Sequence, residues 1–255
     1  MIIDIQELID YIKCPVIYKL KKLNMYTPYI SAHDKYNNDI HSFTYAYNAL
    51  LSSNGSVNYD DVKQIFGSIY LGSKTQEDFI IVETGDSRDT LSTLRKKGTT
   101  NTLDFHEYNI SNTYIPISIR YRYNVSISNI TLTGTIDLIR QKDEEVHIIN
   151  YIANSYNATG SLNNIETLAM VYAFRKIFKT KEDKAIIYLF DKNKELILDI
   201  NKLQIKKLIL NVINVSKAIR NNIIYFNSSD KCNSCAYYSI CSNSKNLDLI
   251  FKKEV

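Results

Sequence analysis

Residues 132–155 read LTGTIDLIRQKDEEVHIINYIANS, which is two apolar β-type segments joined by a charged turn. Gly134 permits a close approach or a bulge within the first segment. Asp137 follows three residues later among apolar neighbours. A carboxylate in such a strand needs a hydrogen bond, an ion pair or a metal. The segment therefore predicts a strand pair that carries a functional or strongly bonded aspartate.

The pattern around this segment predicts an α/β fold, with a mixed central β-sheet flanked by helices. Residues 114–152 predict three strands, with turns near Asn124 and at Gln141–Glu144. A second strand pair is expected over 184–200. Leu203 and Leu208 fall on the apolar side of the last long helix. The helices are predicted at residues 4–24, with a break at Pro15, and at 38–52, 59–70, 87–97, 163–179 and 202–222.

Composition bounds the function classes. The 255 residues are 45% hydrophobic and 23% charged, with 3 Pro and 7 Gly, which excludes a disordered, collagen-like or coiled-coil chain. The net charge of +4 permits a local nucleic-acid-binding patch without requiring one. Neither a membrane span nor a basic leader is visible. We therefore expect an intracellular protein in a reducing compartment, cytoplasmic or in a nuclear or viral-factory setting, with no membrane partner.

Three of the four cysteines are clustered. Cys232, Cys235 and Cys241 form C-x2-C-x5-C, and Cys14 lies in YIKCPVIYKL more than 200 residues away. In a reducing compartment this spacing favours metal over disulfides. Four thiolates suit either a [4Fe–4S] cluster or a tetrahedral zinc site. The alternative is four unrelated buried cysteines.

These residues resemble the PD-(D/E)XK nuclease superfamily, and more narrowly its iron–sulfur RecB-like branch, with the CRISPR-associated RecB-like exonucleases and the AddAB-type nuclease domains. The "CP" element matches at Cys14–Pro15, and a metal-binding histidine matches at His41 in NDIHSFTYAYNALL. The "G-x-x-D" strand matches at Gly134–Asp137. The closing cysteine element matches at Cys232, Cys235 and Cys241.

The resemblance implies a single PD-(D/E)XK (restriction-endonuclease-like) domain over residues 1–255, with a [4Fe–4S] cluster that ties the termini together through the four cysteines. The N-terminal helical part is 1–52, a helical insertion is 53–112, the nuclease-like core is 113–200, and the C-terminal helix and cysteines are 201–255. His41 and Asp137 would hold Mg²⁺ or Mn²⁺ in an active enzyme. The implied partner is DNA, as single strands or duplex ends, and possible protein partners are complexes for DNA processing or transcription.

The sequence departs from the family pattern at the active site. The family stretch like "I-I-D-Y-K-T" aligns with residues 148–153, where the acid position holds Asn150 and the lysine position holds Ile152. A later helix usually carries Gln four residues before Tyr; Tyr172 matches, but position 168 is Leu. Losing one charge-stabilising group commonly slows a reaction roughly 100–1000-fold. The resemblance therefore implies weak or lost metal-dependent phosphodiester hydrolysis.

Two substitutes for the lost residues are conceivable from the sequence. Glu145 and His147 share a strand face just upstream and would supply metal ligands if the register were shifted. Lys142 would supply the cation. The basic stretches Lys19–Lys22, Lys176–Lys184 and Lys202–Lys207 are solvated faces or line a DNA groove together with stacking tyrosines.

Two hypotheses on function follow. The first is an exonuclease-like, DNA-binding or DNA-processing protein with weak or lost catalysis. The second is a non-catalytic structural or interaction subunit of a larger nucleic-acid machine, in which the cluster serves only the fold.

Overall fold

The computed structural model describes residues 1–23, 29–72, 80–82, 90–154, 161–227, 232, 235 and 237–241. Its helices are α1 (Ile5–Lys13), α2 (Pro15–Lys22), α3 (Ala32–Asn54), α4 (Tyr59–Gly72), α5 (Leu91–Ser111), α7 (Ser161–Phe178), α8 (Lys202–Arg220) and α9 (Tyr238–Cys241). Its strands are β1 (Ile2–Asp4), β2 (Tyr29–Ser31), β3 (Ile80–Val82), β4 (Ile115–Ile127), β5 (Ile130–Lys142), β6 (Glu145–Ile152), β7 (Lys184–Leu189) and β8 (Lys194–Leu198).

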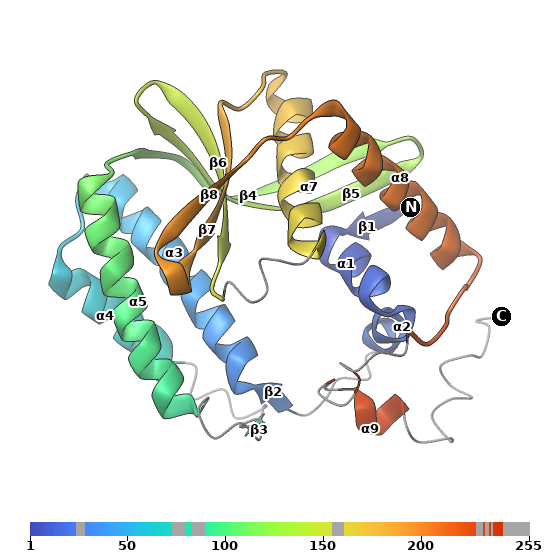
Figure 1. The fold of residues 1–255 in the computed structure, drawn as a ribbon, viewed down its shortest axis with the longest axis horizontal. Helices are drawn as coiled ribbons and strands as arrows, with labels where there is room; N and C mark the ends of the chain where they lie inside the picture. The colour runs from blue at the N-terminus through green and yellow to red at the C-terminus, as the bar shows by residue number, and fades with distance from the viewer. Residues whose placement is uncertain are drawn as a thin grey trace.

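A six-stranded mixed sheet forms the centre (Figure 1). β1 and β6 pair with different parts of one edge of β5, and β4 pairs with its other edge. β7 and β8 follow β6 in the sheet. The pairs β1–β5 and β6–β7 are parallel, and β4–β5, β5–β6 and β7–β8 are antiparallel. The predicted α/β class with a mixed sheet is confirmed. Each of the three antiparallel pairs joins strands that are consecutive in the chain, and α7 provides the long connection that a parallel β6–β7 pair requires.

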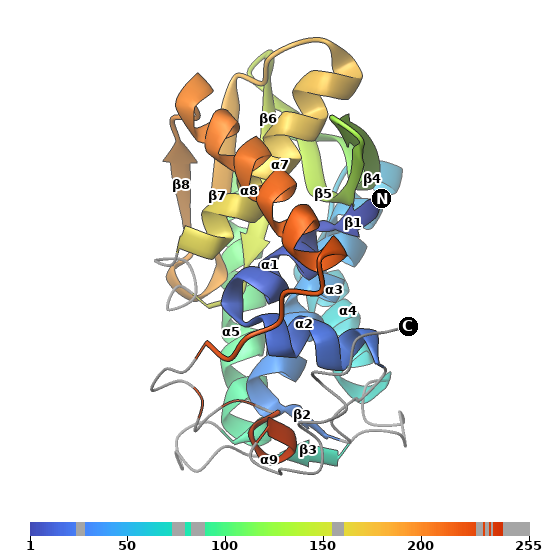
Figure 2. The same cartoon turned by 90° about the vertical axis from the view of Figure 1, so that its right-hand side faces the viewer.

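Helices cover both faces of the sheet (Figure 2). On one face α1, α7 and α8 enclose a core with Ile3, Leu132 and Ile136, all fully buried. On the other face α3, α4 and α5 enclose an aromatic core around Phe43, Phe105 and Tyr188. Burial on both sides explains why the adjacent residues Leu138–Ile139 of β5 and Ile148–Ile149 of β6 are all apolar: one residue of each pair packs into each core. The site described below lies on the sheet between these two groups of helices.

The break predicted in the first helix is confirmed at Cys14. Asp4 caps α1 through a capping box with Glu7, and Cys14 has an extended backbone between the two helices. Pro15 then occupies the first turn of α2, where its missing N–H removes no helical hydrogen bond. The kink places Cys14 at the junction of α1 and α2.

Three details of the prediction were wrong. The turn near Asn124 is absent, because Asn124 pairs with Thr133 and the turn instead falls at Ser128, where φ is +56°. Leu203 is 60% exposed and does not belong to the buried side of α8. The short parallel pair β2–β3 was not anticipated. The other hairpin turn falls at Asp143–Glu144, inside the predicted stretch and with positive φ at both residues.

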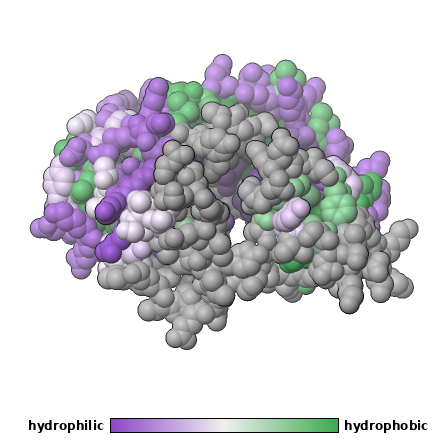
Figure 3. Space-filling view, turned by 60° about the horizontal axis from the view of Figure 1, so that its bottom comes forward, coloured by the Kyte–Doolittle hydropathy of each residue, from purple (hydrophilic) through white to green (hydrophobic). Residues whose placement is uncertain are grey.

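Residues 53–112, predicted to be a helical insertion, contain helices that are longer and more regular than the sequence suggests. Helix α5 continues through Gly98 to Ser111, and residues 87–89 of the predicted helix lie outside the described part of the chain. Hydrophilic residues dominate the surface on the side of α4 and α5, and hydrophobic residues gather toward the side of α2 (Figure 3). Among the described helices, none is both long and apolar enough to cross a membrane.

Candidate functional site

Asp137 lies where the pairing of β5 is interrupted on one side. Along that side β5 pairs with β1 at residues 131–133 and with β6 at residues 138–142. Among the described strands, residues 134–136 therefore pair only with β4, and Asp137 itself belongs to none of the strand registers. The carboxylate of Asp137 enters this gap, where its Oδ2 accepts a hydrogen bond from the backbone N of Tyr151 at 2.9 Å. The aspartate bonds to β6 where that strand leaves β5.

Helix α3 brings two more side chains to Asp137. The Tyr45 hydroxyl donates to Oδ1 of Asp137 at 3.0 Å, and the His41 ring lies 6.3 Å from the Tyr45 ring, one turn away. Burial raises the pKa of Asp137, while His41, the two hydrogen bonds and Arg120 lower it. The guanidinium of Arg120 lies 4.4 Å from the Tyr45 ring centre. The structure therefore places His41 and Asp137 in the same region.

Gly134 provides room for an aromatic side chain beside the site. A Cβ at this position would lie 2.3 Å from the Tyr123 hydroxyl and 2.9 Å from Ile5 Cγ2. Tyr123 is 3% exposed, and its hydroxyl has no hydrogen-bond partner among the described residues. The glycine of the G-x-x-D element is therefore required by packing against Tyr123.

Neither of the two β6 positions that differ from the family pattern, Asn150 and Ile152, brings a charged group to Asp137. Asn150 is 1% exposed, and its Nδ2 donates to Thr167 Oγ1 of α7 at 2.9 Å. Ile152 packs with Ile187 and Leu189 in a small apolar cluster. Where the family pattern has an acid, this chain therefore has an amide that is hydrogen-bonded to α7. Where the pattern has a lysine, the chain has an apolar side chain in the core.

Glu166 on α7 was missed by the sequence analysis. Burial raises its pKa to about 7, with a further contribution from Asp137, while Lys13 lowers it. A signal for Glu166 was present, because it lies three and seven residues before Ala169 and Ala173, which are fully buried. A carboxylate on the apolar face of a helix is unusual. Tyr172, the matched tyrosine of α7, is buried and donates to Ser126 O at 3.4 Å.

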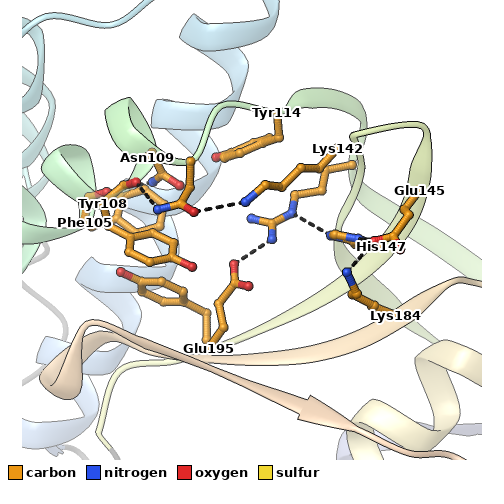
Figure 4. Close-up of polar contacts among 12 residues, drawn as sticks. Phe105, Tyr108, Asn109, Tyr114, Lys142, Glu145, His147, Lys184 and Glu195 are labelled. Atoms are coloured by element: carbon orange, nitrogen blue, oxygen red, sulfur yellow. Dashed lines mark hydrogen bonds and ion pairs between the residues drawn. The ribbon is translucent and has the colours of Figure 1, made fainter.

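The shifted-register alternative is wrong, because Glu145 and His147 belong to a different cluster (Figure 4). His147 Nε2 lies 2.9 Å from Glu145, which also forms an ion pair with Lys184. Lys142 donates to Asn112 at 3.0 Å. These side chains lie at the β6 start and the β5 end, and the interactions there exclude the proposed roles at Asp137.

The four cysteines lie close together around α2 and α9. They form no disulfide. Cys14, Cys235 and Cys241 pack against Val16, Leu20 and Tyr237. Burial, with smaller contributions from the other three cysteines, raises the pKa of the Cys241 thiol to about 11. The C-terminal cysteines thus lie beside Cys14, as Figure 1 shows for α9 and α2.

Within the described residues, no group of three or more His, Cys, Asp and Glu side chains is arranged to hold a metal ion. This applies to the cysteines and to the surroundings of Asp137. Mg²⁺ commonly keeps several waters and binds one or two carboxylates plus substrate phosphates. Asp137 and Glu166, beside the unsatisfied Tyr123 hydroxyl, fit that hydrated mode of binding and do not form an all-protein cage.

The basic stretches differ in how far they are available to a ligand. Lys21 lies 2.6 Å from Asp10 and Lys22 forms an ion pair with Glu7, so this stretch is engaged locally. Lys176, Lys202 and residues 206–207 are exposed. Of the three predicted basic stretches, those at 176–184 and 202–207 therefore have exposed lysines available to a polyanion.

The sheet with its interrupted strand and buried aspartate defines a nuclease-type α/β domain. The chain belongs to the PD-(D/E)XK nuclease superfamily, whose family model matches residues 6–242. None of the curated proteins compared with the chain matches it. A solved structure titled "Crystal structure of SSO0001" is similar over 89% of this chain and 94% of its own, with 10% identity and a TM-score of 0.35.

Proposed function

We propose that this protein binds and processes DNA through the Asp137 site, as a RecB-like member of its superfamily with weak or lost hydrolysis. The observation that carries the proposal is the buried Asp137 carboxylate in the gap of β5, bonded to Tyr45 and to the backbone of Tyr151. Superfamily membership supports a nucleic-acid substrate. Arg120 and Lys13 supply positive charge beside the carboxylates, where a phosphate would lie.

Each side chain has a defined part in this proposal. Asp137, fixed in orientation by its two hydrogen bonds, and His41 would hold Mg²⁺ or Mn²⁺. Bound there, the ion would activate water and stabilise charge on the phosphate. Tyr45 holds the Asp137 carboxylate, and Arg120 attracts the phosphate while stacking on Tyr45. Asn150 and Ile152 contribute neither an acid nor a cation, and this supports low activity.

The test is incubation of anaerobically purified protein with labelled single-stranded and duplex DNA and Mn²⁺. Asp137→Asn is the matched variant, because its amide retains the size of the carboxylate. We expect DNA binding by the wild type, with cleavage at least about 100-fold below that of an intact site. Cleavage at full nuclease rates would contradict the proposed loss, and absence of DNA binding would contradict the proposal as a whole.

A second candidate function is a non-catalytic subunit of a nucleic-acid machine. The observation that favours it is that Asn150 and Ile152 are part of the folded core. The salt dependence of DNA affinity separates the two. A DNA-binding protein loses affinity steeply between 50 and 200 mM salt, while a docking subunit retains little affinity at either concentration.

We further propose a [4Fe–4S] cluster at Cys14, Cys232, Cys235 and Cys241. Their sequence spacing and their proximity support it. In a cluster each thiolate binds a different iron, so the sulfurs stand farther apart than around a single metal. Zinc is the alternative. Anaerobic protein should be brown and contain iron, and Cys14→Ser should lose it; colourless protein with stoichiometric zinc would refute the cluster.

A further inference from the structure

We propose that Glu166 of α7 supplies the second carboxylate of the Asp137 site, in the role that Asn150 cannot fill. This inference rests on the proposed function and deepens it. It replaces an acid from β6 by an acid from the helix that packs over β6. The ligand is a hydrated divalent cation, held by one carboxylate from the sheet and one from α7.

The position of Asn150 points to this replacement. Its side chain is directed at α7, where the amide donates to Thr167, the residue after Glu166. A strand acid at position 150 would therefore face the same turn of α7. Glu166 precedes Thr167 on that turn and interacts electrostatically with Asp137. A carboxylate on the helix in place of one on the strand is therefore still near Asp137.

The environment of Glu166 is that of a site and not that of a surface acid. Within the described part of the chain no hydrogen bond or ion pair engages its carboxylate. Its electrostatic neighbours are Asp137 and Asp4, opposed by Lys13. A half-buried acid without a bonded partner is destabilising, and a function is the usual reason to retain one.

A second, independent observation points to a ligand. The hydroxyl of Tyr123 is buried without a hydrogen-bond partner, and Glu166, Asp4 and Asp137 all influence its pKa electrostatically. A hydroxyl buried beside carboxylates normally finds a partner. Waters around a divalent cation would supply one, because such an ion keeps several waters when few protein ligands are present.

The test is Mn²⁺ binding at pH 8, measured by titration calorimetry and by the electron paramagnetic resonance signal of free Mn²⁺. Four proteins are compared: wild type, Asp137→Asn, Glu166→Gln and Glu107→Gln. Glu107 is exposed on α5 and is the matched control. We expect both Asp137→Asn and Glu166→Gln to weaken binding at least about tenfold, and Glu107→Gln to leave it unchanged. Wild-type affinity in Glu166→Gln would overturn the inference.

Two further variants keep the result interpretable. Glu166→Asp keeps a carboxylate and should retain part of the affinity. Asn150→Asp in the Glu166→Gln background should restore binding, because the acid returns to the strand position. If the wild type binds no Mn²⁺, the inference fails. DNA binding by the same sample then decides whether the nucleic-acid part of the proposed function stands.

Discussion

Replacing Glu195 by Ala should destabilise the protein strongly, because it leaves a buried guanidinium without its carboxylate. Arg140 Nη2 lies 2.6 Å from Glu195, and their side chains are 4% and 16% exposed. The remaining contacts of Arg140 are neutral: a 3.4 Å hydrogen bond to His147 and the Tyr114 ring at 4.8 Å (Figure 4). Breaking such a buried pair by removing one partner typically costs about 3–5 kcal/mol.

The assay is urea unfolding followed by far-ultraviolet circular dichroism. With a slope of about 3 kcal/mol per molar urea, the midpoint should fall by about 1 M or more. The control is Asp60→Ala: the Asp60–Lys63 pair spans 3.8 Å and is 97% and 61% exposed. An exposed pair contributes at most about 1 kcal/mol. Equal losses in the two variants would refute the argument that burial makes Glu195 indispensable to Arg140.

Three further predictions concern the packing and charge of the core. Gly134→Ala should destabilise by about 1–3 kcal/mol in thermal melts, and Tyr123→Phe should not rescue it, because the ring carbon Cζ lies 2.5 Å from the added Cβ. In EDTA, which removes metal ions, the folded protein retains the proton on Glu166 up to a pKa of about 7. The free energy of unfolding should therefore fall as the pH rises from 4.5 to 7. At pH 8, Glu166→Gln should be up to about 3 kcal/mol more stable than the wild type. Burial lowers the pKa of His147, so stability falls as pH drops below 6.5, and His147→Gln should lose less in acid.

Each of these has a clear contradicting result. Rescue of Gly134→Ala by Tyr123→Phe would show that only the hydroxyl crowds the glycine. For the pH predictions, urea midpoints are compared at pH 4, 6 and 8. A Glu166→Gln variant that follows the wild-type curve would place that carboxylate in solvent. Parallel acid losses in wild type and His147→Gln would assign the loss to other groups, such as His106, whose pKa burial also lowers.

The local parts of the fold were predictable because each has its own signal. The capped first helix, the break at Pro15 and the β5–β6 hairpin follow from residues adjacent in sequence. The length of α5 was not predictable, because Lys96–Thr100 includes a glycine and two threonines with poor helix propensity. The structure shows why Gly98 is there: a Cβ would lie 2.4 Å from the Phe66 ring. Tertiary packing overrides propensity at this point.

The site divides in the same way. Asp137 and His41 were proposed from the sequence pattern, and the structure brings α3, which carries His41, to Asp137 of β5. Glu166 was not found, because the family pattern directs attention to β6 and treats α7 as a helix with only a Gln and a Tyr. Its helical spacing to the buried alanines of α7 marks it as unusual, but its relation to the strand position becomes visible only when α7 packs on β6 through Thr167 and Asn150.

The gap in β5 gives a physical reason why the proposed move of the second acid from β6 to α7 would be tolerated. Between its pairing with β1 and with β6, the strand leaves residues 134–137 without a partner on one side. In this gap the Asp137 carboxylate accepts a hydrogen bond from the backbone N–H of Tyr151, so Asp137 has a structural role that does not depend on any ligand. The second acid has no such structural role in the sheet. It can therefore come from β6 or from α7, provided that it reaches the same opening beside Asp137.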